Sequence, residues 1–221
     1  MAISKFNYNS FNVTPVANKA LGFNADADGF TAASGSSMIL IKTLTADASG
    51  TSLTFHHGSS DVVFDSTYPV YYFEFINIHP ATDGADLVWQ VNTVGASGFN
   101  ETITSTFWDA YHSEGNAGKS IRYLTSYDQA QGTAYQYMTN AIGNDNDQNL
   151  NGSMYFFNPS STTFTKHFMH TINTHTGDDY SENQFGAGYV NTTNAIDEIQ
   201  FKINSGNMDA GIIKLYGIAD S

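Results

Sequence analysis

The sequence of 221 residues contains no cysteine and only one arginine, Arg122. The lack of cysteine excludes disulfides and thiolate metal sites, and it leaves the redox compartment undefined. Charged residues make up 13% of the chain, about half of the roughly 25% that is usual in globular proteins. The formal net charge of −13 argues against a nucleic-acid partner and against electrostatic docking on an anionic membrane, because both require a basic surface.

Long hydrophobic runs are also missing. No apolar segment approaches the roughly 18 residues that are needed to span a bilayer, and the first residues lack the apolar region of a signal peptide. We therefore expect synthesis in the cytoplasm without a secretion signal. The missing charge is replaced by Asn, Ser, Thr and Gly, together with 13 tyrosines and 16 phenylalanines. Such a composition favours strands and turns over helices.

Strand patterns recur at short spacing from residue 36 onward, which is typical of a sandwich or barrel. The strongest runs from Val70 to Ile78, with Tyr71, Phe73 and Phe75 on one face and Tyr72, Ile76 and Ile78 on the other. A strand that is apolar on both faces is central in its sheet or covered by a partner. The sequence thus predicts an all-β fold, a sandwich or barrel that begins at residue 36, with a short helix allowed only at 125–139.

Residues 1–35 differ from the rest of the chain. They contain isolated aromatic residues, Pro15 and scattered glycines, and no period of 2 or 3.6 persists. We interpret this segment as an extended N-terminal arm. Two alternatives remain open, since the arm either is held by a neighbouring subunit or packs against its own domain.

Asp145, Asp147 and Asn149 form the best metal candidate, because oxygen ligands at alternate positions can converge on calcium. The loop does not match an EF-hand, however. Leu150 occupies the position that requires glycine, and Phe156 occupies that of the bidentate glutamate. The competing interpretation is a solvated turn between two strands. No other cofactor is indicated.

Catalytic motifs are absent: there is no nucleophile elbow, P-loop, dinucleotide-binding fingerprint or paired-histidine zinc helix. The adjacent His56 and His57 point apart on a strand, and His167 and His170 lie on opposite faces. A glycan-degrading enzyme needs two carboxylates about 5–10 Å apart, and no spacing pairs the five glutamates. We therefore expect that the protein is not an enzyme.

Four tyrosines lie close together in the sequence, among Asn, Gln and Thr: Tyr123, Tyr127, Tyr135 and Tyr137. Aromatic rings can pack on sugar faces while amides reach hydroxyl groups, so the cluster suits a glycan contact. The same residues are common in subunit interfaces and in ordinary cores. All three interpretations remain open, with core or interface favoured.

The run from Ile196 to Ile218, IDEIQFKINSGNMDAGIIKLYGI, resembles the last two strands of jelly-roll structural proteins from tailed-bacteriophage virions. In those proteins an alternating strand meets a Ser-Gly-Asn turn, and Leu-Tyr-Gly ends the final strand. The stretch from Ser36 to Phe75 is similar in its order of strands and turns. The resemblance implies a jelly-roll-like antiparallel β-sandwich over residues 36–221. It further implies that this lectin-like sandwich is often trimeric and is located in the virion, and it implies no active-site residue.

The expected function is that of a non-enzymatic virion structural protein, which stabilises or decorates the particle as a head decoration or a tail accessory. A single domain with a short arm and no fibrous stalk favours this role. The alternative is a tail-fibre or receptor-binding appendage that recognises host surface glycan, and a glycan-degrading enzyme ranks third. The expected partners are other copies of the chain, with a homotrimer as the first expectation, and other virion proteins.

Overall fold

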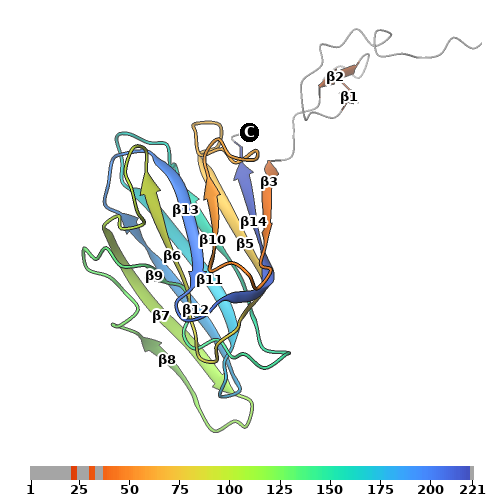
Figure 1. The fold of residues 1–221 in the computed structure, drawn as a ribbon, viewed down its shortest axis with the longest axis vertical. Helices are drawn as coiled ribbons and strands as arrows, with labels where there is room; N and C mark the ends of the chain where they lie inside the picture. The colour runs from red at the N-terminus through yellow and green to blue at the C-terminus, as the bar shows by residue number, and fades with distance from the viewer. Residues whose placement is uncertain (1–20, 24–29, 33–36, 220–221) are drawn as a thin grey trace, which may run out of the picture.

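The computed structural model describes residues 21–23, 30–32 and 37–219, and it contains strands but no helix in those residues. The strands pair antiparallel; β1 and β2 form a small sheet of their own, and the strands from β3 onward form two sheets that pack as a sandwich (Figure 1), which confirms the predicted all-β fold. Their bounds are β1 Leu21–Phe23, β2 Phe30–Ala32, β3 Met38–Thr45, β4 Ser52–His56, β5 Val70–Pro80, β6 Leu87–Thr93, β7 Ile103–Ser113, β8 Lys119–Tyr123, β9 Gln136–Tyr137, β10 Leu150–Phe157, β11 Lys166–His175, β12 Tyr180–Val190, β13 Ile196–Ile203 and β14 Met208–Ile218.

The predicted N-terminal arm, residues 1–35, lies mostly outside the described residues. Within it, β1 and β2 pair antiparallel, with Leu21 opposite Ala32 and Phe23 opposite Phe30. The arm and its two possible docking modes stay predictions.

The larger sheet has the strand order β3-β14-β5-β10-β11-β12-β7-β8, and the smaller has the order β4-β13-β6-β9. When β7, β8, β11 and β12 are left out, the remaining eight strands divide into β3-β14-β5-β10 and β4-β13-β6-β9. The first strand then lies beside the last in one sheet, and the second lies beside the last but one in the other. This is the arrangement of a jelly roll. The four other strands are insertions that extend the larger sheet beyond β10.

The apolar core lies between the two sheets, under the jelly-roll strands and the neighbouring inserted strand β11. Phe73 on β5 contacts Phe201 on β13, with ring centroids 5.1 Å apart, and Trp89 on β6 contacts Phe168 on β11 at 4.8 Å. All four side chains are fully buried. Aromatic pairs bury large areas and prefer such tilted or edge-on contacts, so these rings hold the sheets together.

The inserted strands have a different interior. The inner face of β12 and β7 is covered by the segment between residues 124 and 149, which contains the two-residue strand β9 and no helix. Buried Gln136 accepts a hydrogen bond from Ser105 at 2.6 Å, and buried Gln184 donates to the carbonyl of Asn140 at 3.3 Å. Buried polar groups need such partners. The sandwich is therefore apolar between the jelly-roll strands and β11, and its interior includes many polar groups under β12 and β7.

One detail of the predicted strand at residues 70–78 is wrong. Ile78 does not share a face with Tyr72 but is fully buried in the core. Asn77 has a φ of 51°, and the pairing with β10 shifts register between Leu150 and Gly152. The extra residue of a β-bulge reverses the direction of the side chains that follow. The central position predicted for this strand is correct, because β5 lies between β14 and β10.

Candidate functional site

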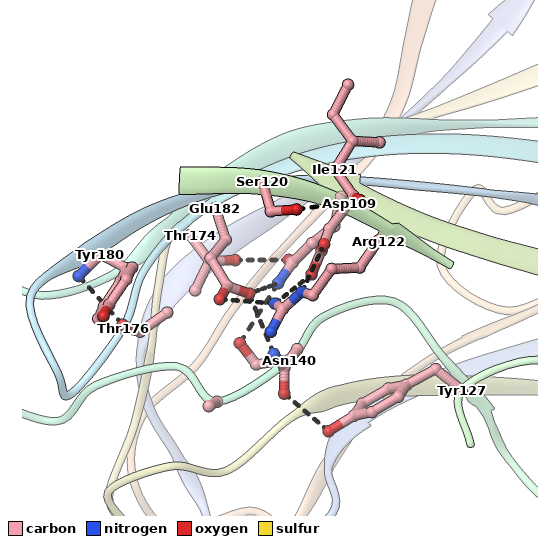
Figure 2. Close-up of polar contacts among 12 residues, drawn as sticks. Asp109, Ser120, Ile121, Arg122, Tyr127, Asn140, Thr174, Thr176, Tyr180 and Glu182 are labelled. Atoms are coloured by element: carbon pink, nitrogen blue, oxygen red, sulfur yellow. Dashed lines mark hydrogen bonds and ion pairs between the residues drawn. The ribbon is translucent and has the colours of Figure 1, made fainter. Parts of the chain in front are cut away.

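The inserted strands carry a polar pocket of about 440 Å³ on the inner side of the larger sheet. Tyr111 on β7, Arg122 on β8, and Tyr180 and Glu182 on β12 line it from the sheet, and loop residues close it from below. The lining from the loops consists of Asp83, Gly84, Asn140, Ala141, Thr176, Gly177 and Asp178. Figure 2 shows part of this lining, with Arg122, Glu182 and Asn140 close together and Tyr180 and Thr176 beside them.

Arg122 lies at the centre of the pocket wall between two carboxylates. Its Nε and Nη2 donate to the two oxygens of Asp109 at 3.0 and 2.6 Å, and Nη2 also donates to Glu182 Oε1 at 3.0 Å. The guanidinium lies over the ring of Tyr111, 4.3 Å from the centroid. Arginine suits this place because its planar fork matches a carboxylate and stacks on an aromatic ring. In Figure 2 Ile121, the preceding residue, points away from the cluster.

The second oxygen of Glu182 is also occupied. Its Oε2 accepts hydrogen bonds from Asn140 Nδ2 and Gln184 Nε2, both at 3.1 Å. Tyr127 in turn donates to Asn140 Oδ1 at 2.8 Å (Figure 2). Every oxygen of the Asp109 and Glu182 carboxylates therefore accepts a hydrogen bond from the protein.

Burial governs the pKa values around this cluster. Burial raises the pKa of Glu182, and the nearby Asp109 adds to the effect. Burial also raises the pKa of Asp86 to about 6, against hydrogen bonds from Ala141 and Asn204 that favour its charged form. The hydrogen bond to Asp109 raises the pKa of Arg122, which stays a cation. Acidic groups thus outnumber the arginine that faces them.

The outer face of β7, β10, β11 and β12 is uncharged, whereas Lys119 of the adjacent β8 lies on the same side of the sheet, opposite His112. Side chains alternate along β7, β10, β11 and β12, and no outward residue on these strands is Asp, Glu, Lys or Arg. The outward set is Thr104, Thr106, Trp108, Ala110, His112, Asn151, Ser153, Tyr155, Phe157, His167, Met169, Thr171, Asn173, His175, Ser181, Asn183, Phe185, Ala187 and Tyr189. The face is thus neutral in a chain with a net charge of −13.

Cross-strand register places large and small outward residues in two parallel rows. One row runs Trp108, Phe185, Thr171, Ser153, and the next runs Thr106, Ala187, Met169, Tyr155. In the first row the large residues lie on β7 and β12, and the small ones lie on β11 and β10. In the second row the large residues lie on β11 and β10, and the small ones lie on β7 and β12. Between them lies an open slot of about 310 Å³. We call this cavity the aromatic slot.

The walls of the aromatic slot are partly fixed by ring contacts. Trp108 and Phe185 stack with their centroids 4.1 Å apart and their planes 9° apart. On the opposite wall, Tyr155 packs against Tyr72 of β5 at 5.0 Å. Trp108, Tyr155 and Met169 are nevertheless 38%, 40% and 55% exposed, so the slot opens directly to solvent.

The predicted calcium ligands lie in the loop that precedes β10. Asp145 and Asp147 are exposed, and the carbonyl of Asp145 accepts a hydrogen bond from Gln148 N at 2.8 Å, which closes a turn. Asn149 Oδ1 accepts a hydrogen bond from Asn151 Nδ2 at 2.7 Å. Within the part of the chain that the structure describes, no three His, Cys, Asp or Glu side chains form a group suited to a metal ion. The calcium site stays a prediction.

The four tyrosines singled out in the sequence do not form one surface. Tyr127 and Tyr137 contact each other at 4.7 Å beneath the larger sheet, and Tyr135 donates to Gln200 on β13 at 2.5 Å. Tyr123 is 53% exposed on β8, on the outer face, opposite Trp108. Two tyrosines therefore pack inside, one contacts the smaller sheet, and one lies on the outer side of β8, next to the uncharged face.

Sequence reasoning missed both features of the inserted strands. The single arginine was visible as a rarity, and its isolation in an acidic chain was a signal for a buried ion pair. The aromatic slot had no local signal, because its residues come from four strands that span residues 106–187.

Among the described residues there is no helix long and apolar enough to cross a membrane.

The chain was compared with family models, with curated proteins and with solved structures, and no match was found in any of the three.

Proposed function

We propose that this chain is a non-enzymatic binding component of a bacteriophage particle, and that the outer face of β7, β10, β11 and β12 is its contact surface. The observation that carries the proposal is the uncharged, aromatic-rich outer face in a strongly acidic chain. Surfaces of this kind serve in protein interfaces and in ligand grooves. The virion location rests on the resemblance of residues 196–218 to jelly-roll proteins of tailed phages.

The polar pocket supports a non-enzymatic role. The carboxylates of Asp109 and Glu182 each have both oxygens engaged by Arg122, Asn140 or Gln184. Buried ion pairs that are satisfied in this way stabilise an arrangement of strands, whereas a general acid or base must reach a substrate proton. We propose that this cluster fastens β8 to β7 and β12.

Two partners fit the contact surface. Neighbouring particle proteins fit the decoration or tail-accessory role, and a homotrimer stays the first expectation for the assembly. Host surface glycan fits the receptor-binding alternative, and the aromatic slot with its hydroxyl-bearing floor is the specific observation that favours it. Both partners use the same face.

The test begins with purified particles of the phage that encodes the chain. Mass spectrometry is expected to find the chain in the virion, and a copy number that matches the capsid lattice indicates decoration, whereas a few copies indicate the tail. Absence of the chain from the particles contradicts the virion proposal.

The contact surface is tested by Met169→Glu, which places a charge at the centre of the face. Particles assembled with this variant are expected to lose the chain or to lose adsorption to host cells. Phe164→Glu is the matched control, because Phe164 is 69% exposed but lies in the loop before β11. Equal behaviour of both variants contradicts the assignment of the surface.

A further inference from the structure

We propose that the aromatic slot binds a neutral saccharide, with one sugar ring seated between the Phe185 and Tyr155 walls. The inference rests on the proposed contact surface and names its ligand. It assigns to the slot a chemical class that has both apolar faces and hydroxyl edges.

The walls fit the faces of a sugar ring. A pyranose presents axial C–H groups on its faces, and these pack on aromatic rings through dispersion and through the negative potential of the ring face. Phe185 is already stacked on Trp108 at 4.1 Å, and Tyr155 already packs on Tyr72 at 5.0 Å. Because these contacts exist without ligand, little side-chain entropy is lost when a sugar enters.

The floor fits the hydroxyl edge. Small residues occupy the floor, namely Ser153, Thr171, Thr106 and Ala187. Serine and threonine hydroxyls donate one hydrogen bond and accept two, so they match the hydroxyl groups of a sugar. Among the described residues, Ser153 and Thr171 make no side-chain hydrogen bond, so both hydroxyls are available to a ligand. The hydroxyl of Thr106 already donates to the Ala187 carbonyl at 3.3 Å and retains its capacity to accept.

Charge decides between ligand classes. No Lys or Arg faces outward on the four strands of the slot, and the whole chain carries −13, so phosphorylated, sulfated and carboxylated ligands are repelled. A wholly apolar peptide side chain would leave the floor hydroxyls without partners. The slot volume of about 310 Å³ lies at the small end of ligand sites, which suits a single sugar ring in a longer chain.

The slot contains its own reporter. The sequence has two tryptophans; Trp108 lies in the wall and is 38% exposed, whereas Trp89 is fully buried in the core. Ligand in the slot is expected to shield Trp108 from acrylamide quenching, and Trp89 reports whether the fold is intact. Binding and folding are thus separable in one fluorescence experiment.

The full chain is to be applied to an array of neutral oligosaccharides, such as glucans, mannans and galactans, with sialylated and uronic-acid glycans alongside. Saturable binding of at least one neutral series and none of the acidic ones is expected. The Phe185→Ala and Tyr155→Ala variants are each expected to raise Kd by about tenfold or more, since each removes one ring wall. Phe164→Ala, which removes an exposed ring elsewhere, is expected to leave Kd unchanged.

Three results overturn the inference: no neutral oligosaccharide binds, acidic glycans bind equally well, or Phe185→Ala and Tyr155→Ala bind as the wild type does. If Phe185→Ala fails to fold, Tyr155→Ala still tests the inference. Tyr155 lies on the opposite wall and is already 40% exposed, so its replacement is expected to leave the fold intact. If Met169→Glu abolishes particle attachment while no saccharide binds, the proposed contact surface stands and the glycan inference fails.

Discussion

Arg122 connects three strands of the inserted part through two carboxylates, and its side chain is 36% exposed. Removing it leaves Asp109 and Glu182 side by side with 0% and 7% exposure. Arg122→Met is expected to lower the free energy of unfolding by about 2 kcal/mol, less than the roughly 3–5 kcal/mol of a fully buried pair because water reaches the guanidinium. Urea denaturation at neutral pH measures the change.

Lys119 is the matched control for Arg122, since it lies on the same strand and its Nζ contacts only Asn116, at 3.2 Å on the surface. Lys119→Met is expected to change the unfolding free energy by less than about 0.5 kcal/mol. Equal losses in both variants would show that the carboxylate cluster does not depend on its arginine.

His170 and Asp86 respond to acid in opposite directions. Burial lowers the pKa of His170 from 6.5 to about 3, so the unfolded chain takes up a proton first and stability falls as the pH drops below 6.5. Burial raises the pKa of Asp86 from 3.8 to about 6, so the folded chain takes up a proton first and stability rises as the pH drops from 6 towards 3.8. Between pH 6 and 4 the two effects oppose each other.

Each single variant is therefore expected to reveal the other group. On going from pH 6 to pH 4, the free energy of unfolding of His170→Leu should rise relative to that of the wild type. That of Asp86→Asn should fall relative to the wild type, and each change should be roughly 1–2 kcal/mol. Denaturation curves at the two pH values provide the measurement. The assignment is contradicted when the two variants change in the same direction relative to the wild type.

At the scale of the element, the bulge in β5 decides what the strand contributes to the core. Asn77 adopts a φ of 51°, and its backbone N–H donates to Asn151 Oδ1 at 2.8 Å. The next residue, Ile78, points inward and is fully buried. Asparagine tolerates this left-handed conformation better than β-branched residues do.

Asn77→Val is accordingly expected to destabilise the protein by about 1–2 kcal/mol, because valine in the left-handed region is strained. Asn77→Gly is expected to be nearly neutral. Asn173→Val provides the control, since Asn173 is an exposed residue of β11 that is absent from the positive-φ residues. Thermal unfolding compares the three variants, and equal losses at positions 77 and 173 would remove the bulge as the cause.

For the whole molecule, net charge and contact surface make opposite contributions to association. A net charge of −13 repels other copies of the chain, whereas the outer face that we propose as the contact surface is neutral and its flanking Glu74 is paired with Lys214 at 3.4 Å. At 0.1 M salt the repulsion between charges more than about 10 Å apart is largely screened. Apolar contact is not weakened by salt. Attachment to particles is expected to be equal or stronger at high salt, as co-sedimentation at two salt concentrations can measure. Loss of attachment at high salt would indicate charged docking instead.

The strands of the jelly roll could be predicted because their signal is local. Alternation of period two, as at Ile199, Phe201 and Ile203, places one face in a core whatever the rest of the chain does. The turn at Gly206 was equally predictable, since its φ of 79° is easy only for glycine. Even the error at Ile78 was local in origin, because a bulge inserts one residue without changing the apolar pattern.

The sites depended on the tertiary structure, for a physical reason. Arg122 meets Glu182 across 60 positions, and Trp108 meets Phe185 across a strand pair whose register only the folded sheet defines. Composition and alternation were enough for the sequence alone to predict an all-β sandwich or barrel in an acidic, cysteine-free chain, and the jelly roll was predicted from the resemblance of residues 196–218 before the strand order gave it. Which strands were inserted, which carboxylates the arginine neutralises and where the neutral face opens a slot were decided by long-range pairing, because side chains become neighbours only once the sheet has formed.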